Sequence, residues 1–473
     1  MKRLTKGQIW IFAIGQLGWS ILGGIINAWL VTFYLPTQDN LEAGAHTYIQ
    51  GGFIFWVLTI LGIVTFICRI FDAVTDPLIA TWSDSSKNKR GRRIPFMQIA
   101  AIPFAVCAVL VFYAPVDAIS SINVFWILGF LLLFYFFMTM YCTPYNALIS
   151  EFGKTPEDRM YISTAISLTY FFGTVISYLP FVLGGPLQSF VSFNDSYRIC
   201  FIALAVIAAI CMLLPTFLLK ETDFVESKPS KTNTFRSLAA TYKNRDFRVF
   251  VGSDIAYWVG LTLFQTGLPF FVQVSMKLDS SFTMIFLGGM TVLSAALYPI
   301  VGKFVKRFGK KKMTIAGFLG LALAYVITAL IGVIPAPGLV YGILIVVIAA
   351  LPMALLGIIP QSIVADIAEA DSVLTQEKRE GMFFASRTFA MKLGQSVAML
   401  AFTSLAILGV NQDTASNDIV ASELGLRLVA IVAIAFCLLG AVVLFFYREK
   451  NVNDVIARGK KEQKSALEAE SKE

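Results

Sequence analysis

The chain has 473 residues, of which 57% are hydrophobic and 14% are charged, and its mean hydropathy is +0.73. Soluble globular proteins contain about 45–50% apolar and about 25% charged residues. This composition excludes a soluble fold as well as the disordered, collagen-like and coiled-coil classes. The six cysteines include no CxxC pair and His46 is the single histidine, so neither a disulfide scaffold nor a His-cluster metal site is expected. The sequence therefore predicts an integral membrane protein.

Long, continuous apolar runs indicate spanning helices rather than the alternating segments of a membrane β-barrel. Each spanning helix requires about 20 mostly apolar residues. The predicted fold class is an all-α membrane protein with twelve transmembrane helices. The predicted spans are 9–35, 52–82, 94–115, 122–150, 160–184, 198–219, 249–274, 282–304, 313–334, 338–366, 381–409 and 424–447.

The distribution of Lys and Arg among the loops sets the orientation. With a cytoplasmic N-terminus, the inner segments hold 32 of the 38 Lys and Arg residues and the outer segments hold three. Both termini are therefore predicted to be cytoplasmic, in a multi-pass protein of the cell membrane. The net charge of +8 follows from this bias, because basic loops such as 87–93 and 306–312 face anionic headgroups. No nucleic-acid partner is expected for so apolar a chain.

A short repeat relates the two parts of the chain. DPLIA (76–80) followed by GRR (91–93) corresponds to YPIVG (298–302) followed by GKK (309–311). Two like halves around a central loop are typical of secondary transporters, which hold their substrate near the middle of the bilayer. The predicted domains are an N-terminal half (1–219), a cytoplasmic central loop (220–248), a C-terminal half (249–447) and a cytoplasmic tail (448–473).

Ionisable side chains inside a span are costly in lipid and indicate functional sites. Arg69, Asp72 and Asp76 lie at spacings of three and four, along one stripe of the second span. At about 1.5 Å per residue, Asp72 and Lys392 of the eleventh span both lie about 16 Å from the cytoplasmic ends of their spans. A cation and an anion at equal depth are able to pair across the two halves.

Two carboxylates on one stripe repel each other at low dielectric, so either one binds a proton or a metal cation lies between them. Carboxylate oxygens and a hydroxyl such as that of Thr75 suit a hard cation such as Na+. The alternative is a static network in which Arg69 binds one aspartate and Lys392 binds the other. Because Tyr298 occupies the position of Asp76 in the second repeat, the cation site is expected in the N-terminal half.

Three further charged residues lie close to predicted span ends. Arg387, about 9 Å from the cytoplasmic end of its span, is expected to extend its guanidinium to the interface. Asp254 and Asp366 are likewise interpreted as interfacial.

The substrate wall is predicted from polar and aromatic residues that share helical faces, because sugar sites combine neutral hydrogen-bonding groups with an aromatic platform. The alternative is that these side chains only bridge helices, as Ser, Asn and Gln often do in bilayers. The candidates are Gln16, Trp19, Ser20 and Asn27 on span one, Cys142, Tyr145 and Asn146 on span four, and Trp258 and Gln265 on span seven.

Five segments spread over nearly the whole chain carry a more specific signal. They are RIFDAVTDPLIATWSDSSKNKRGRRIPF (69–96), CTPYNALISE (142–151), YKNRDF (242–247), IVADIAEAD (363–371) and FAMKLGQSVA (389–398). In sequence and order they resemble the glycoside–pentoside–hexuronide:cation symporter family of the major facilitator superfamily. The resemblance implies a major facilitator fold and the uptake of a sugar or glycoside by alternating access, coupled to Na+, Li+ or H+.

The resemblance also implies roles for individual residues. In the melibiose-permease branch of that family, the residues that match Asp72, Asp76 and Thr139 form the cation site, and Lys392 matches an intramembrane lysine. That branch has asparagine at the position of Thr75, and this difference makes a proton a serious candidate beside Na+.

The galactoside-binding residues of that branch are not kept, so a melibiose carrier is not expected. Their positions are occupied here by Ser20, Cys142, Asn146 and Ile166. The stretch after span two is similar to the gating motif of the superfamily. The similarity implies that Asp84, together with Arg92 and Arg93, holds the inner gate closed while the carrier faces outward.

The same residues disfavour other classes of function. No G-x-x-x-x-G-K-[ST] loop argues for an ATP-driven pump. An enzyme is not expected, because His46 lies in an outer loop and Cys142 has no evident base, and no cofactor beyond the coupling ion is implied. Transport of a lysolipid, as in animal relatives of the family, or of an amphipathic drug is the alternative function. The expected partners are a small sugar or glycoside, a monovalent cation and the lipid bilayer, with the carrier acting as a monomer.

Overall fold

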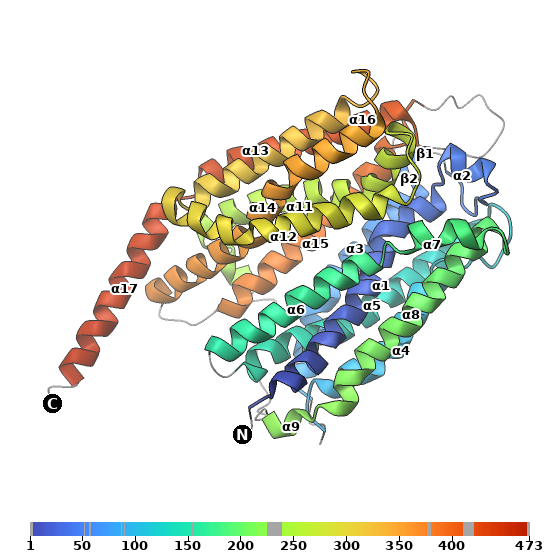
Figure 1. Ribbon diagram of the computed structural model, residues 1–473. Coiled ribbons are helices and arrows are strands. Elements are labelled where there is room, and N and C mark those ends of the chain that lie inside the picture. The colour runs from blue at the N-terminus through green and yellow to red at the C-terminus, as the bar shows by residue number, and fades with distance from the viewer. Residues whose placement is uncertain are drawn as a thin grey trace.

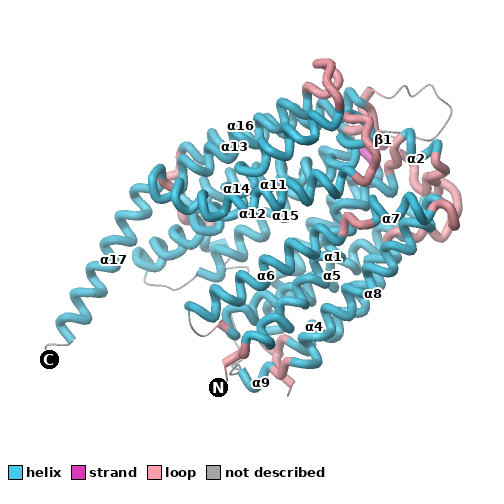
Figure 2. The backbone as a smooth tube through the Cα atoms, viewed as in Figure 1, coloured by secondary structure: helices cyan, strands magenta, loops and turns pink. Residues whose placement is uncertain are grey.

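The computed structural model is almost entirely helical (Figures 1 and 2). It describes residues 3–51, 53–55, 58–86, 88, 90–153, 156–224, 239–375, 380–409 and 421–470. The first part of the chain forms α1 (Lys6–Tyr34), α2 (Gln38–Glu42), α3 (Ile60–Asp84), α4 (Ile94–Leu110), α5 (Ser121–Phe152), α6 (Pro156–Ile176), α7 (Pro180–Leu187), α8 (Phe193–Leu218) and α9 (Glu221–Phe224). The second part forms α11 (Arg245–Phe270), the π-helical turn η1 (Phe271–Ser275), α12 (Phe282–Phe308), α13 (Lys310–Ala329), α14 (Gly338–Thr375), α15 (Glu380–Leu405), α16 (Glu423–Phe445) and α17 (Glu449–Glu470).

Polar caps determine where several long helices begin. The Thr5 side chain accepts a hydrogen bond from the backbone N–H of Gln8 at the start of α1, and the Gln8 side-chain oxygen accepts one from the backbone N–H of Thr5. Thr59 caps α3 and Asn244 caps α11 through their side-chain oxygens. The first backbone N–H groups of a helix have no partner within it, and lipid offers none, so these caps fix the helix starts.

Nine helical segments of the described chain are long and apolar enough to cross a membrane. The helix α4 is apolar but shorter, and α3 and α15 carry charged residues within the predicted spans. Each predicted span range thus contains a helix, while twelve membrane crossings and cytoplasmic termini stay a prediction.

The helix boundaries differ most from the predicted ranges at three places. Residues expected to begin the second span include two short antiparallel strands, β1 (Phe53–Phe55) and β2 (Leu58–Thr59), and α3 starts only at Ile60. The predicted fifth span is broken, because α6 ends at residue 176 and α7 begins at Pro180, a residue that lacks a backbone donor. The helix α14 continues to residue 375, well beyond the predicted end at 366.

The two parts of the chain repeat one packing scheme. In the first part α1 packs against α6 and α8, α3 against α5, and α4 against α5 and α8. In the second part α11 packs against α15 and α16, α12 against α14, and α13 against α14 and α16. Each pair in the second list is the counterpart, six spans later, of a pair in the first. The helices therefore form two like halves.

The halves meet mainly along α3 and α15, whereas the corresponding pair, α6 and α12, makes a much smaller contact. Two hydrogen bonds also join the halves at the end of the molecule far from both termini (Figure 1). The Thr37 hydroxyl donates to Gln273 at 3.2 Å, and the Ser280 hydroxyl donates to the Phe181 carbonyl at 3.2 Å. We refer to the contact of α3 with α15 as the seam.

The break between α6 and α7 lies against α1. The Trp29 indole N–H donates to the Ser177 carbonyl at 3.3 Å, and its ring stacks on Phe181 with centroids 3.8 Å apart. The glycine at position 24 has no side chain to hold the helices apart, and a Cβ there would collide with Ser177. The carbonyl freed by the break is thus satisfied within the same half.

Candidate functional site

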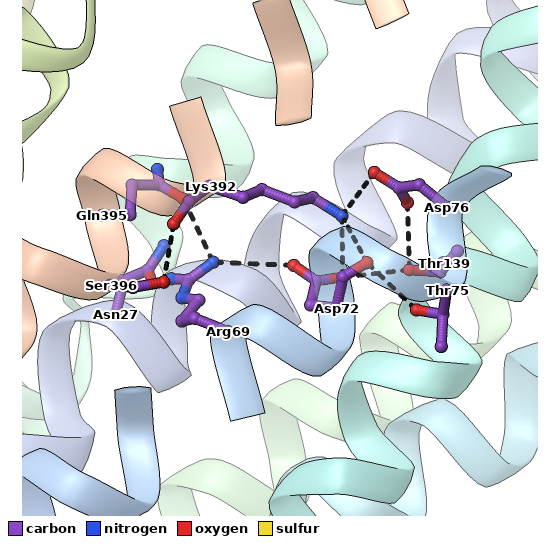
Figure 3. Close-up of polar contacts among 9 residues, drawn as sticks. All are labelled: Asn27, Arg69, Asp72, Thr75, Asp76, Thr139, Lys392, Gln395 and Ser396. Atoms are coloured by element: carbon purple, nitrogen blue, oxygen red, sulfur yellow. Dashed lines mark hydrogen bonds and ion pairs between the residues drawn. The ribbon is translucent and has the colours of Figure 1, made fainter. Parts of the chain in front are cut away.

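The centre of the seam holds two carboxylates around one ammonium group (Figure 3). Lys392 reaches from α15 and places its Nζ 2.7 Å from Asp72 Oδ1 and 2.6 Å from Asp76 Oδ2. The two aspartates come from one stripe of α3, as their spacing predicts, so both carboxylates face α15. One positive charge therefore bridges two negative charges between the halves.

A hydroxyl from a third helix joins the carboxylates. Thr139 of α5 donates to Asp72 at 2.9 Å and also lies 3.2 Å from Asp76 Oδ1. Thr75, expected to add an oxygen ligand, instead donates its hydroxyl to the Asp72 backbone carbonyl at 3.0 Å. The carboxylates differ in exposure, since the Asp72 side chain is fully buried and that of Asp76 is 24% exposed. A small cation would reach Asp76 first.

Arg69 continues the charged stripe but binds no carboxylate closely. Its nearest carboxylate oxygen is Asp72 Oδ2 at 4.0 Å, while its terminal nitrogens donate to Asn27 at 2.6 Å and to Gln395 at 3.2 Å. Its guanidinium also lies over the Tyr135 ring, 4.9 Å from the centroid. Its Nε is buried without a hydrogen-bond partner. Arg69 is thus held largely by neutral groups and connects α1, α3 and α15.

A cavity of about 70 Å³ opens beside Asn27, between α1 and α6 and reaching α11 of the other half. The Trp19 indole N–H at its wall is buried without a partner. The cavity is lined by Trp19, Ser20, Gly23, Gly24, Asn27, Tyr170, Thr174, Tyr178 and Gln265. Four of the predicted substrate residues, Trp19, Ser20, Asn27 and Gln265, therefore share one cavity.

The remaining substrate candidates do not line this cavity. The Gln16 side chain donates to Ser20 at 3.0 Å, and the buried Tyr145 donates to the Phe12 carbonyl and stacks on its ring. Asn146 is exposed, whereas Cys142 and Trp258 are half-buried. Tyr145 thus has the contacts of a residue that joins α5 to α1.

Sequence reasoning missed residues on both sides of the site. Tyr170, Thr174 and Tyr178 occur at intervals of four on the broken fifth span, and this spacing could have identified them as one polar face. Gln395, three residues after Lys392, holds Arg69 across the seam and was signalled only by its helical spacing from the lysine.

The Arg387 side chain does not extend away from the helices as expected but pairs with Asp254, and the interfacial depth of the two residues stays a prediction. Arg387 Nε and Nη2 donate to the two Asp254 oxygens at 2.8 and 3.0 Å, and the side chains are only 11% and 1% exposed. A bidentate pair satisfies both charges inside the C-terminal half, so the guanidinium has no need to reach water. Asp366, also expected at an interface, binds Lys310.

The basic loops after α3 and α12 are built alike, with a glutamate seated on the start of the following helix. Glu221 accepts from the backbone N–H groups of Arg92, Arg93 and Ile94 at 2.9 to 3.0 Å. Glu449 accepts in the same way from the backbones of residues 310 and 311. A carboxylate at a helix N-terminus satisfies free donors and favours the helix dipole.

Each of these loops contains a glycine at positive φ close to the start of the following helix, +117° at Gly91 and +86° at Gly309, a conformation that other residues rarely adopt. The predicted gating residues Arg92 and Arg93 both bind Glu151 of α5. The Asp84 side chain lies outside the described residues, so its part in a gate stays a prediction.

Comparison with known proteins places this architecture in a family. Residues 11–450 match the family model described as MFS/sugar transport protein. The chain is 23% identical to a putative sulfoquinovose importer of Salmonella typhimurium, covering 94% of this chain and 90% of that protein. It is 24% identical to a sodium-dependent lysophosphatidylcholine symporter of Xenopus tropicalis, covering 81% and 79%. The fold matches a crystal structure of the nucleoside transporter NupG with a TM-score of 0.62 at 12% identity, over 93% and 98% of the chains.

The chain belongs to the glycoside–pentoside–hexuronide:cation symporter family of the major facilitator superfamily. It is accordingly a multi-pass membrane transporter and not an enzyme, as the sequence predicted.

Proposed function

We propose that this protein couples the entry of Na+, Li+ or H+ to the uptake of a sugar or glycoside across the cell membrane. The observation that carries the proposal is the ammonium of Lys392 between Asp72 and Asp76 at the seam. The two carboxylates and the Thr139 hydroxyl supply hard oxygen ligands, and the lysine holds the place that a monovalent cation would take.

The lysine gives the empty carrier an internal counter-charge. An incoming Na+ competes with the ammonium for the carboxylates, whereas an incoming proton neutralises one of them. Either event weakens the attachment of α15 to α3, because the ion pairs across the seam involve these two carboxylates. Ion binding is thus linked to movement of one half against the other, as alternating access requires.

The hydrogen bonds at the end far from the termini support a direction for this movement. The links from Thr37 to Gln273 and from Ser280 to Phe181 hold that end closed. If both termini are cytoplasmic, this is the inward-facing arrangement, from which sugar and cation leave into the cell. The closed outer end and the 24% exposed Asp76 together fit a carrier that is open to the inside.

The proposal is tested by uptake into proteoliposomes from a mixed panel of glycosides, pentoses and hexuronides, read by mass spectrometry. Inward Na+, Li+ and H+ gradients are applied separately, with Asp72→Asn as the matched control. Accumulation that needs a gradient and is lost in the variant supports symport and identifies the ion. Failure of every sugar to accumulate under every gradient contradicts the proposal.

Transport of a lysolipid is the second candidate, because one relative is a sodium-dependent lysophosphatidylcholine symporter. Against it, Asn27, Thr174 and Gln265 place hydrogen-bonding groups on the cavity wall, and an acyl chain offers these groups no partner. Adding fluorescent lysophosphatidylcholine to the same panel separates the two functions.

A further inference from the structure

The turn between α12 and α13 carries a dense group of positive charges. We call it the basic turn and define it by Lys303, Lys306, Arg307, Lys311 and Lys312. The first three lie at spacings of three and four, so they share one face of α12. All but Lys311 are exposed, and none of the five forms an ion pair with another residue that the structure describes. Such a group creates a local positive potential that attracts an anionic partner.

The carboxylates that contact this turn are occupied by other groups. Asp366 binds Lys310, and Glu449 accepts hydrogen bonds from the backbone N–H groups of residues 310 and 311. Glu449 is the first residue of α17, which leaves the bundle beside the turn (Figure 1). The basic turn therefore keeps its excess of positive charge in the folded protein.

The corresponding loop of the N-terminal half directs its cations inward. Arg92 and Arg93 both bind Glu151 of α5. In the C-terminal half, Lys311 holds the position that corresponds to Arg93 but is bound differently. Its Nζ donates to the Phe445 carbonyl at 2.6 Å and lies 4.9 Å from the centroid of the Phe445 ring. Lys311 is thus directed to an exposed aromatic side chain at the end of α16 rather than to an internal acid.

Exposed phenylalanines accompany the cations of the basic turn. Phe445 and Phe446 are 67% and 60% exposed, and Phe304 and Phe308 lie on α12 among the basic residues. The Arg307 guanidinium lies over the Phe308 ring, 5.3 Å from its centroid. Exposed apolar side chains that lie together mark a surface for contact with lipid or with another protein. Their combination with cations is typical of surfaces at the boundary between headgroups and acyl chains.

The outward face of α12 changes from apolar to basic within one helical turn. Val292 and Ile300 are exposed on the same face that carries Lys303 and Arg307. Ile300 and Lys303 are separated by only about 4.5 Å along the helix axis. The acyl chains and the phosphate of a phospholipid follow each other in the same order across the surface of a bilayer.

We propose that the basic turn is a binding site for an anionic phospholipid. Its phosphate binds Arg307 and the neighbouring lysines, and its acyl chains lie along the apolar face of α12 and against the exposed phenylalanines. Arg binds phosphate through two parallel hydrogen bonds, and basic groups at the ends of membrane helices hold anionic headgroups. Each Lys or Arg near an anionic headgroup raises the affinity about fivefold. The site lies in the inner leaflet if both termini are cytoplasmic, and it does not depend on which solute is carried.

The test compares two phospholipids that share their acyl chains and differ in headgroup charge. The full chain is purified in detergent with equal amounts of phosphatidylglycerol and phosphatidylcholine, and native mass spectrometry counts the lipids that it retains. We expect phosphatidylglycerol to be retained at least about tenfold more than phosphatidylcholine. This preference should fall at least about tenfold in Lys306→Gln/Arg307→Gln/Lys312→Gln and about fivefold in Arg307→Gln. Equal retention of the two lipids by the parent protein overturns the proposal.

Two controls separate a lipid site from general attraction between charges. Lys243→Gln/Arg245→Gln/Arg248→Gln removes the same charge from exposed cations around the start of α11 and should leave the preference within about twofold. An equal loss in both triple variants would count against the basic turn. Glycerol phosphate carries the phosphate without acyl chains, and its displacement of the lipid at millimolar concentration would show a site for free phosphate and reject the lipid. Circular dichroism shows whether each variant is folded, and Arg307→Gln alone decides the outcome if the triple variant is not.

Discussion

The helices α3 and α12 hold the same place in the two halves and have opposite chemistry. Both contain a proline, Pro77 and Pro299, and both are followed by a basic loop that contains a glycine at positive φ shortly before the next helix. The residue before the proline is Asp76 in α3 and Tyr298 in α12, and α12 carries the neutral Ser294 where α3 carries Asp72. The two helices thus share their proline and the loop that follows, but only α3 carries charged residues at these positions.

The partners of these two helices differ in the same way. The helix α3 packs against α15 along the seam, where Lys392 forms ion pairs with the carboxylates of α3. The helix α12 makes only a small contact with α6. Coupling to an ion needs only one site, and a second buried charge cluster would add desolvation energy without adding a function. The symmetric fold therefore allows the two halves to move against each other, and the charges, which lie on α3 and not on α12, make that movement depend on the ion.

The largest effect is expected from removing the lysine of the seam. Lys392→Ala leaves Asp72 and Asp76 facing each other without a counter-charge. Breaking a buried ion pair in this way destabilises a protein by about 3–5 kcal/mol. Thermal unfolding of the purified carrier in detergent measures the loss. The double variant Lys392→Ala/Asp76→Asn should recover part of it, and an equally unstable double variant would contradict the charge explanation.

Removing the buried carboxylate should abolish coupling. In Asp72→Asn the neutral amide cannot balance a cation, so we expect gradient-driven uptake to fall at least about 100-fold, which corresponds to about 2.7 kcal/mol. Initial uptake rates with and without the ion gradient provide the measurement. Facilitated exchange of sugar without a gradient can persist, and a variant that still concentrates sugar would disprove the role of Asp72.

A smaller effect is expected at the hydroxyl that joins both carboxylates. Thr139→Val keeps the shape of the side chain but removes the hydrogen bond to Asp72, a bond to a charged group worth about 1.5–3 kcal/mol. The ion concentration for half-maximal uptake should rise about tenfold or more. Thr139→Ser restores the hydroxyl and serves as the control, and equal ion dependence in both variants would exclude Thr139 from the site.

The smallest effect is expected in the counterpart helix. Ser294→Ala and Tyr298→Phe change the positions in α12 that correspond to the aspartates of α3, and neither residue contributes a charge. The ion dependence of uptake should stay within about twofold of the parent, because surface and uncharged changes away from a site seldom exceed about 0.5 kcal/mol. A changed ion preference in either variant would show that the second half takes part in ion binding.

The fold and the charged centre were largely predictable from the sequence, because lipid enforces simple rules. Long apolar runs must form helices in lipid. An intramembrane charge needs a partner, so the stripe of Arg69, Asp72 and Asp76 and the matching depth of Lys392 predicted one charged site between the halves. The structure brings these residues together across the seam.

The details that depend on tertiary packing were not predictable in this way. The pairing of Arg387 with Asp254 was hidden because both residues lie near span ends, where charges need no protein partner. The burial of Tyr145 against Phe12 and the contact of Glu221 with the start of α4 depend on how helices approach each other. Sequence periodicity gives the face of a helix but not the neighbour that covers it.

The broken fifth span has a mechanical consequence. An interruption in a membrane helix is often a point of bending, but here the carbonyl of Ser177 is bonded to Trp29 and the backbone of α1 approaches closely at Gly24. Opening this joint would leave a polar backbone group facing hydrocarbon, a cost of several kcal/mol. Residues 177–179 are therefore expected to be a fixed corner rather than a hinge, so each half should turn as one stiff body and confine the exchange of contacts to the surface between them.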